Sequence, residues 1–133
     1  MNEETNINLA NLLFNKEEIK SVEYYEEKYP YRKEKVVTRF APSPTGFVHI
    51  GSLYTAFINQ KYSSDAKGIF FLRIEDTDQN RLIKGSIEGI IKDLKNFNIT
   101  INEGALNEIE ETGIYGPYKQ SERLNIYKSF AYH

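Results

Sequence analysis

The sequence has no cysteine among its 133 residues. The chain therefore forms no disulfide bond and offers no thiolate ligands for a zinc site. A run of about 20 apolar residues, which a helix needs to cross a bilayer, is also missing, and the N-terminus lacks the pattern of a secretory signal peptide. These absences predict a cytoplasmic protein that has no membrane partner.

An excess of positive charge, usual in independent nucleic-acid-binding domains, is missing as well. The chain has 17 basic and 19 acidic side chains and a formal net charge of −2. Residues 1–35 hold 6 basic and 8 acidic side chains, and residues 36–133 hold 11 of each. We therefore expect most of the contacts with any nucleic acid to come from regions outside this chain.

Two prolines and two glycines shape the stretch from Arg39 to Ser52, which reads RFAPSPTGFVHIGS. Proline favours extended backbone in the residue before it, and glycine lets a ligand approach closely. A β-forming segment at 36–40 precedes the stretch, and apolar residues at helical spacing follow it. With Ser52 as the N-cap, the free N–H groups of the predicted helix point back at this loop and suit an anion.

A second apolar segment at 68–74 is followed at once by Glu75, Asp76 and Asp78. The strand, helix and second strand predict a right-handed βαβ unit. Open parallel sheets bind ligands at the carboxyl ends of their strands. We expect Arg39 and Glu75 to lie together at that edge.

These blocks resemble the glutamyl-tRNA synthetases, which are class I aminoacyl-tRNA synthetases. The resemblance covers about three quarters of the chain, from residue 36 onward. It is carried by the loop at 39–52, LRIEDTD at 72–78, NEG at 102–104 and YGPYKQSER at 115–123. It implies an α/β fold: an incomplete Rossmann-type parallel sheet with flanking helices, preceded by a helical N-terminal appendage.

The general class I signature is His-x-Gly-His, and Ser52 occupies its last position here, which varies within the glutamate-specific branch. Glutamine-specific relatives are expected to carry a Pro-Glu-Pro-Asn-type loop where this chain has PSPT at 42–45. A closer rival is the tRNA-modifying paralogue that attaches glutamate to a modified base and often reads His-x-Gly-Ser-Leu. The Glu-Asp-Thr-Asp block, the lead-in segment and the absence of cysteine favour the synthetase, because the paralogue often carries a zinc cluster.

The resemblance implies a role for each matching residue in binding glutamate. Arg39 would bind the side-chain carboxylate of the substrate, a task that suits its fork of donors. Glu75 would accept hydrogen bonds from the substrate ammonium group. Ala41 and Ser43 would line the amino-acid pocket.

The ATP-binding signature matches His49, Gly51 and Ser52, and His49, the implied catalytic residue, would donate to phosphate oxygens in the transition state. Asp78 and Arg81 match positions that meet the acceptor end of the tRNA. The implied reaction uses ATP with Mg²⁺ and needs no covalent enzyme intermediate, because positioning and charge stabilisation drive it. No residue is predicted as a metal ligand, and no zinc site is expected.

Each of these residues also has an ordinary structural interpretation. His49 alone is typical of a partly exposed structural histidine. Arg39 and Glu75 form a plain ion pair in that interpretation, and Asp76 and Asp78 are turn or helix-cap residues. The joint occurrence of four separated blocks in family order favours the functional interpretation.

The remaining segments give simpler predictions. An amphipathic helix that covers the sheet is indicated by the spacing of Ile83, Ile87, Ile90, Ile91, Leu94 and Phe97. Residues 98–113 predict a polar surface loop or short helical turn. Ser121 predicts the N-cap of a last helix with one apolar side made of Leu124, Tyr127 and Ala131.

We predict two parts, an appendage at 1–35 and the N-terminal half of a catalytic domain at 36–133. Glu17–Tyr29 predicts a charged helix that ends before Pro30. An apolar cluster precedes it, made of Leu9, Leu12, Leu13 and Phe14. The plain alternative is a solvated tail.

Family members continue beyond the position of His133 through the rest of the sheet, a Lys-Met-Ser-Lys-Ser-type loop and an anticodon-binding region. We expect the 133 residues alone to bind ATP poorly and to charge tRNA undetectably, since that lysine loop stabilises the leaving pyrophosphate. An inert remnant and a non-catalytic glutamate- or nucleotide-binding module remain alternatives.

Overall fold

The computed structural model describes residues 8–9, 11–12 and 19–132. The chain forms two compact units, residues 32–121 and residues 1–31 with 122–133. Part of the predicted apolar cluster and the start of the predicted charged helix lie outside the described residues, namely Leu13, Phe14 and Glu17. Among the described helices, none has the length and apolar character required to cross a membrane. The division at residue 35 stays a prediction.

The larger unit is built on a four-stranded sheet whose strands follow the order β1-β2-β3-β4. The strands are β1 (Val37–Phe40), β2 (Ile69–Leu72), β3 (Glu103–Ala105) and β4 (Glu111–Thr112). The first three are parallel, and β4 runs antiparallel to β3. The predicted α/β class is confirmed, with one antiparallel edge strand that was not expected.

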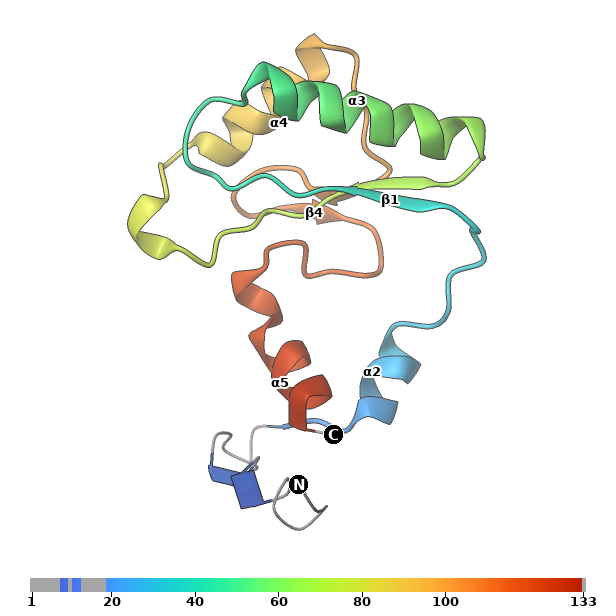
Figure 1. Ribbon diagram of the computed structural model, residues 1–133, viewed down its shortest axis with the longest axis vertical. Coiled ribbons are helices and arrows are strands. Elements are labelled where there is room, and N and C mark those ends of the chain that lie inside the picture. Colours follow the sequence, from blue (N-terminus) through green and yellow to red (C-terminus); the bar gives the residue numbers. More distant parts are fainter. Residues whose placement is uncertain (1–7, 10, 13–18, 133) are drawn as a thin grey trace. The chain divides into compact units, whose positions relative to one another are not determined.

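Two helices connect the parallel strands and cover the sheet. Helix α3 (Ile50–Asp65) joins β1 to β2, and α4 (Ser86–Asn96) lies between β2 and β3. Both helices lie on the same face of the sheet (Figure 1). The predicted strand–helix–strand unit is therefore present, and Arg39 of β1 pairs in register with Phe71 of β2.

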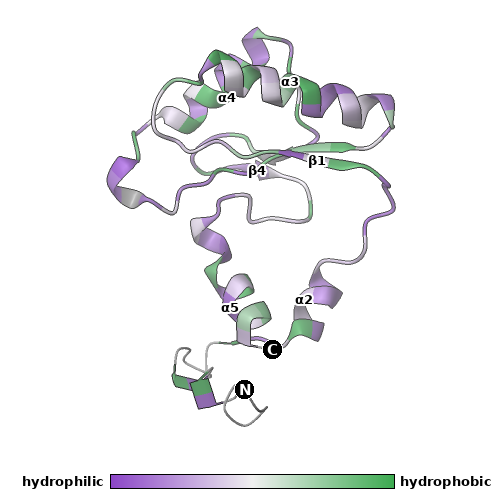
Figure 2. Cartoon of the chain, in the orientation of Figure 1, coloured by the Kyte–Doolittle hydropathy of each residue, from purple (hydrophilic) through white to green (hydrophobic). Residues whose placement is uncertain are grey.

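The core of this unit fills the space between the sheet and the two helices. Along β2, Phe70 and Leu72 are fully buried while Phe71 is half-buried, as the two-residue period of a strand requires. Phe71 contacts the Tyr118 ring at a centroid distance of 6.2 Å. In Figure 2 the strand β2 beside β1 is hydrophobic, whereas the 3₁₀ turn η2 (Gln79–Arg81) after β2 is hydrophilic.

Helix α4 has the predicted core face, since Ile87, Ile90, Ile91 and Leu94 are buried. The outer two positions of the predicted pattern, Ile83 and Phe97, lie outside the helix and are 52% and 55% exposed. The helix is shorter than the pattern because it starts after Gly85, whose φ is +79°.

The prediction of a loop over residues 98–113 is wrong, because β3 and β4 lie there. The Asn102 backbone N–H donates to Phe70 O (2.8 Å), and the Asn102 Oδ1 accepts from Phe70 N–H (2.8 Å). Gly104 has φ +133°, and a Cβ there would lie 2.3 Å from the Leu72 carbonyl oxygen. Glycine thus allows β3 to approach β2, and a three-residue strand built this way has no apolar pattern to reveal it.

The smaller unit contains α2 (Val22–Lys28) and α5 (Leu124–Tyr132). Ser21 caps α2 by accepting from Tyr24 N–H at 3.2 Å, so the described helix begins later than predicted. It ends before Pro30, as expected. Tyr25 is buried, and its ring lies 6.3 Å from that of Phe130.

The prediction of which side of the last helix is apolar and buried is wrong. The residues that α5 buries are Ile126 and Ser129, whereas the predicted side consists of exposed residues, namely Leu124, Tyr127 and Ala131. Ser129 is tolerated inside because its hydroxyl donates to Asn125 O at 3.0 Å. The predicted cap is also not formed as expected, since the Ser121 hydroxyl donates to Asp76.

Candidate functional site

The loop between β1 and α3 is held in place through the carbonyl groups of its two prolines. Pro42 O accepts from Glu75 N–H at 3.0 Å. Pro44 O accepts from Ile83 N–H at 3.1 Å and from the Ser86 hydroxyl at 2.9 Å. The loop is therefore tied both to the end of β2 and to the start of α4.

His49, and not Ser52, is the N-cap of α3, so the predicted cap is wrong. The helix begins three residues earlier than predicted, because His49 Nδ1 accepts from Gly51 N–H at 3.0 Å. Ser52 lies in the first turn, where its N–H donates to His49 O at 2.9 Å. With Nδ1 as the acceptor, the neutral imidazole carries its proton on Nε2, which makes Nε2 a donor.

Arg39 and Glu75 lie together at the carboxyl ends of β1 and β2. The distance from Arg39 Nη1 to Glu75 Oε1 is 3.5 Å, and the side chains are 42% and 32% exposed. Arg39 alternates with buried Phe40, and Glu75 with buried Ile74, so both point away from the core. The sequence predicted this juxtaposition, and the geometry also matches the plain ion pair that was the alternative.

Arg73 is a third member of this cluster, and sequence reasoning did not name it. Arg73 Nη2 lies 3.2 Å from Glu75 Oε1, and its side chain is 18% exposed. The available signal was alternation, since Arg73 and Glu75 are two residues apart and share a face. Two guanidinium groups and one carboxylate give the cluster a formal charge of +1.

Ala41 and Ser43 follow β1 directly, on the loop described above. Ala41 is half-buried and Ser43 is exposed. Ser43 O accepts from Thr45 N–H at 2.9 Å, which closes a tight turn within the loop. Their roles in binding stay predictions.

Asp78 and Arg81 meet each other at the η2 turn. Arg81 Nε donates to Asp78 Oδ2 at 2.6 Å, and the side chains are 67% (Arg81) and 48% (Asp78) exposed. Solvent-exposed pairs of this kind contribute little to stability. Their predicted contact with the acceptor end of a tRNA stays a prediction.

A second network of charges, missed by sequence reasoning, joins Arg32 to Glu103. The Nη1–Oε1 and Nη2–Oε2 distances are 2.9 and 2.6 Å, and the guanidinium lies 3.7 Å from the Tyr115 ring centroid. The Tyr118 hydroxyl donates to Glu103 Oε2 at 2.6 Å. A separation of 71 residues between Arg32 and Glu103 leaves no local signal for the pair.

This network shifts the pKa values of its members. The hydrogen bond from Arg32 lowers the pKa of Glu103, and the same bond raises the pKa of Arg32. Burial raises the pKa of the Tyr118 phenol, and its hydrogen bond to Glu103 raises it further. Glu103 is thereby held as a carboxylate and Tyr118 as a neutral donor.

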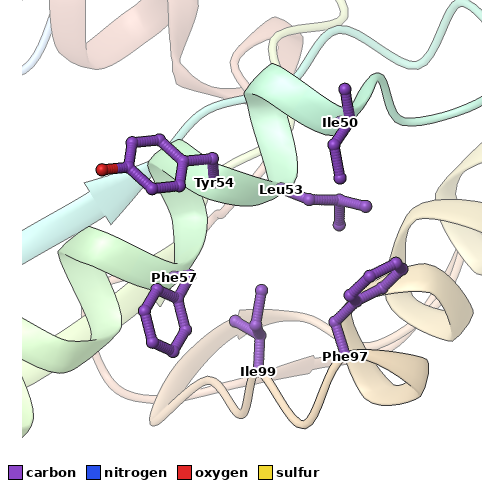
Figure 3. A pocket seen from close by; sticks show the side chains of 6 residues that line it. All are labelled: Ile50, Leu53, Tyr54, Phe57, Phe97 and Ile99. Atoms are coloured by element: carbon purple, nitrogen blue, oxygen red, sulfur yellow. The ribbon is translucent and has the colours of Figure 1, made fainter.

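An apolar pocket of about 230 Å³ lies between α3 and the end of α4 (Figure 3). It is lined by Ile50, Leu53, Tyr54, Phe57, Phe97 and Ile99. Its only side-chain polar atom is the Tyr54 hydroxyl, so nothing in it would compensate a buried carboxylate or phosphate. We therefore place the candidate site at the carboxyl edge of the sheet.

No group of three or more His, Cys, Asp or Glu side chains that could hold a metal ion is found in the part of the chain that the structure describes. We assign no metal ligand among these residues. At the carboxyl ends of β1 and β2, the charged side chains that meet are those of the arginine–glutamate cluster.

The family model for tRNA synthetases class I (E and Q), catalytic domain, matches residues 35–133. A glutamate–tRNA ligase of Clostridium beijerinckii is 49% identical over 126 residues, which are 92% of this chain and 23% of that protein. The chain thus spans about a quarter of the length of the curated relatives it matches.

Two solved structures are similar as well. The glutamate-tRNA synthetase of Elizabethkingia anophelis is 42% identical, with a TM-score of 0.67 over 73% of this chain and 19% of that chain. A glutamate tRNA ligase of Elizabethkingia meningosepticum, solved in complex with its amino acid, is 42% identical with a TM-score of 0.66 over 73% of this chain and 18% of that chain.

Proposed function

Because the chain belongs to the class I tRNA synthetases (E and Q), catalytic-domain family, we propose that it supplies the glutamate- and ATP-binding part of a glutamate–tRNA ligase. The whole enzyme would activate glutamate with ATP and transfer it to tRNA during translation in the cytoplasm. Curated relatives with that name, and a neighbour solved with its amino acid, support this choice.

The observation that carries the proposal is the charge of the cluster formed by Arg39, Arg73 and Glu75. Its formal charge is +1, and glutamate at neutral pH carries two carboxylates and one ammonium group, a net charge of −1. In the proposed complex the side-chain carboxylate of the substrate lies on Arg39 and the ammonium group on Glu75. Glutamine would leave the positive charge unmatched.

The 3.5 Å pair between Arg39 and Glu75 is compatible with this exchange of partners. Both side chains are more than a quarter exposed, and pairs of this kind contribute at most about 1 kcal/mol. A substrate that offers a carboxylate to one residue and an ammonium group to the other replaces one weak ion pair by two. Ala41 and Ser43 lie on the adjoining loop, where we propose that they line the same pocket.

ATP is proposed to bind at the start of α3. His49 is an exposed residue whose Nε2 would donate to a phosphate oxygen, and the helix N-terminus favours negative charge there. At Gly51 a Cβ would lie 3.2 Å from His49 Nδ1, so glycine keeps the cap compact and leaves room for the nucleotide. Ser52 belongs to the same turn.

In the proposed reaction an α-carboxylate oxygen of glutamate attacks the α-phosphorus of ATP. The new O–P bond gives glutamyl-adenylate, and the bond to the bridging oxygen breaks to release pyrophosphate. A ribose hydroxyl at the tRNA end then attacks the activated carbonyl and releases AMP. Mg²⁺ is proposed to arrive with ATP, held through phosphate oxygens. Asp78 and Arg81 are proposed to meet the acceptor end.

Titration calorimetry with a non-hydrolysable sulfamoyl analogue of glutamyl-adenylate tests the proposal on the 133-residue chain. We expect binding that Arg39→Ala weakens about 50-fold, because a charge-assisted contact is lost. Lys61→Ala removes another exposed cation, which pairs with Asp65, and should leave the affinity unchanged. Absence of binding, or equal binding by the Arg39 variant, would refute the proposal and favour an inert remnant.

The role of His49 can be separated from its capping role. Asparagine is a good N-cap, so His49→Asn should keep the melting temperature of the chain. The same substitution should lower the affinity for the sulfamoyl analogue. His49→Ala should lower both. If His49→Asn binds like the unmodified chain, His49 acts only as a cap.

A further inference from the structure

Residues 118–121 run alongside the end of β2 and extend the sheet past its last regular pair. Ile74 N–H donates to Tyr118 O, and Gln120 N–H donates to Ile74 O, both at 2.8 Å. Ile74 pairs with Lys119 in a parallel bridge. We call residues 118–121 the brace. It holds the residue directly before Glu75.

The brace also holds the residue directly after Glu75. Asp76 is 7% exposed, and its two carboxylate oxygens accept from Ser121. Ser121 N–H donates to Oδ1 at 2.8 Å, and the Ser121 hydroxyl donates to Oδ2 at 2.6 Å. Hydrogen bonds to a carboxylate are stronger than those between neutral groups, so Ser121 holds Asp76 firmly in place.

Glu75 therefore sits on a short backbone segment that is fixed from both sides. Its own N–H donates to Pro42 O on one side, and its neighbours Ile74 and Asp76 are bound by the brace on the other. Glu75 lies beyond the last residue of β2, so the regular ladder does not fix it. The brace takes over that task.

The far end of the brace is anchored independently of the candidate site. Tyr118 N–H donates to Glu111 Oε1 at 2.6 Å, and the Tyr118 hydroxyl donates to Glu103 at 2.6 Å. Tyr118 is 2% exposed. The brace is therefore held at Tyr118 by contacts that do not involve Glu75 or Asp76.

We propose that Ser121 and Asp76 are positioning residues that hold the Glu75 carboxylate where it receives the substrate ammonium group. This inference rests on the proposed function. Neither residue touches the substrate in this arrangement. Loss of the Ser121 hydroxyl removes one of the hydrogen bonds that hold Asp76 and lets Glu75 shift, and shifts of about 1 Å at a positioned group cost up to about 100-fold in rate or affinity.

The test compares two probes on the full chain. One is the sulfamoyl analogue of glutamyl-adenylate, and the other is the same molecule with hydrogen in place of the α-amino group. Calorimetry gives the ratio of their dissociation constants, which reports only the contact with the ammonium group. We expect Ser121→Ala to reduce this preference about tenfold and to leave the affinity for the deaminated probe nearly unchanged.

Two further variants exclude a merely structural effect. Ser121→Thr retains the hydroxyl and should restore the preference. Ser63→Ala is the matched control, because Ser63 is 1% exposed and its hydroxyl donates to Asn59 O and Gln60 O within α3. Ser63→Ala removes a buried serine hydroxyl near the C-terminal end of α3. It should lower the affinity for both probes equally or leave both affinities unchanged.

The outcomes separate this inference from the function on which it rests. If the unmodified chain prefers the amino-bearing probe, Glu75→Gln abolishes that preference, and Ser121→Ala keeps it, the positioning role is wrong and the proposed function stands. If the unmodified chain binds neither probe, or binds both equally, the proposed function fails at Glu75, and the positioning role fails with it.

Discussion

Arg32 and Glu103 meet through two contacts of 2.9 and 2.6 Å, whereas Arg39 and Glu75 meet through one contact of 3.5 Å. The first pair has side chains that are 18% and 13% exposed, and the second has side chains that are 42% and 32% exposed. Both are arginine–glutamate pairs of the same unit. They differ in how completely the surrounding protein satisfies them.

The surroundings of Arg32 and Glu103 complete their bonding. Tyr118 donates to the carboxylate, and Tyr115 packs against the guanidinium face. The Arg39 and Glu75 pair leaves most of the guanidinium fork and one carboxylate oxygen available to a ligand. The bidentate, mostly buried pair of Arg32 and Glu103 thus supports the fold, whereas the longer, exposed pair of Arg39 and Glu75 is suited to exchange partners.

The largest effect should follow from breaking the satisfied pair. Arg32→Ala leaves the Glu103 carboxylate half-buried without its main partner, and we expect the free energy of unfolding to fall by about 2 to 3 kcal/mol. Urea denaturation followed by circular dichroism measures this. The exposed-pair variant Lys61→Ala serves as the control. If Arg32→Ala lowered the free energy of unfolding by less than half of this amount, the Arg32–Glu103 pair would contribute no more to stability than an exposed pair does.

The next effect concerns the loose pair and the shape of its cation. Arg39→Lys keeps the charge but loses the bidentate fork, and we expect the affinity for the sulfamoyl analogue to fall about 20-fold. Calorimetry on the variant at constant ionic strength gives the value. Unchanged affinity would show that a point charge suffices, against the carboxylate geometry proposed for Arg39.

A smaller effect is expected from lowering the pH, which should reduce the contribution of Glu103 to the free energy of unfolding. The pKa of Glu103 is lowered in the folded state from its ordinary value of 4.5, so its contribution to stability is present above pH 4.5 and is lost as the pH falls through the folded value. The difference in free energy of unfolding between the unmodified chain and Glu103→Gln should narrow as the pH falls below 4.5. Denaturation series at several pH values test this. A constant difference would contradict the lowered pKa.

The smallest effect should be that of Arg39→Ala on stability. Because the Arg39 contact is exposed and long, we expect the free energy of unfolding to change by less than about 0.5 kcal/mol. The same urea series measures it. A loss comparable to that of Arg32→Ala would assign Arg39 to the fold and remove the contrast between the pairs.

The sequence predicted the parts of the fold that local pattern determines. The β1–α3–β2 unit, the core face of α4 and the meeting of Arg39 with Glu75 all follow from periodicity and from the rule that parallel strands end at one edge. Strand β3 could not be found in this way, because Gly104 and the pairing with Leu72 are tertiary features.

The candidate site was predicted only in part for similar reasons. His49 replaces Ser52 as the cap because an imidazole nitrogen can accept the same bond, and helix-start rules favour the hydroxyl. The Arg32 network and the bond from Ser121 to Asp76 join residues 71 and 45 positions apart. Such pairs depend on how the elements pack, which no local spacing encodes.

The carbonyl groups of Pro42 and Pro44 have a practical consequence for following this protein in solution. Their amide partners, Glu75 and Ile83, give two built-in reporters of the proline loop. Hydrogen–deuterium exchange at these two amides would record each opening of the loop, one reading its attachment to β2 and the other its attachment to α4. A ligand that slows exchange at both amides stabilises both attachments of the loop. A ligand that slows exchange at one amide stabilises only the attachment that this amide reports.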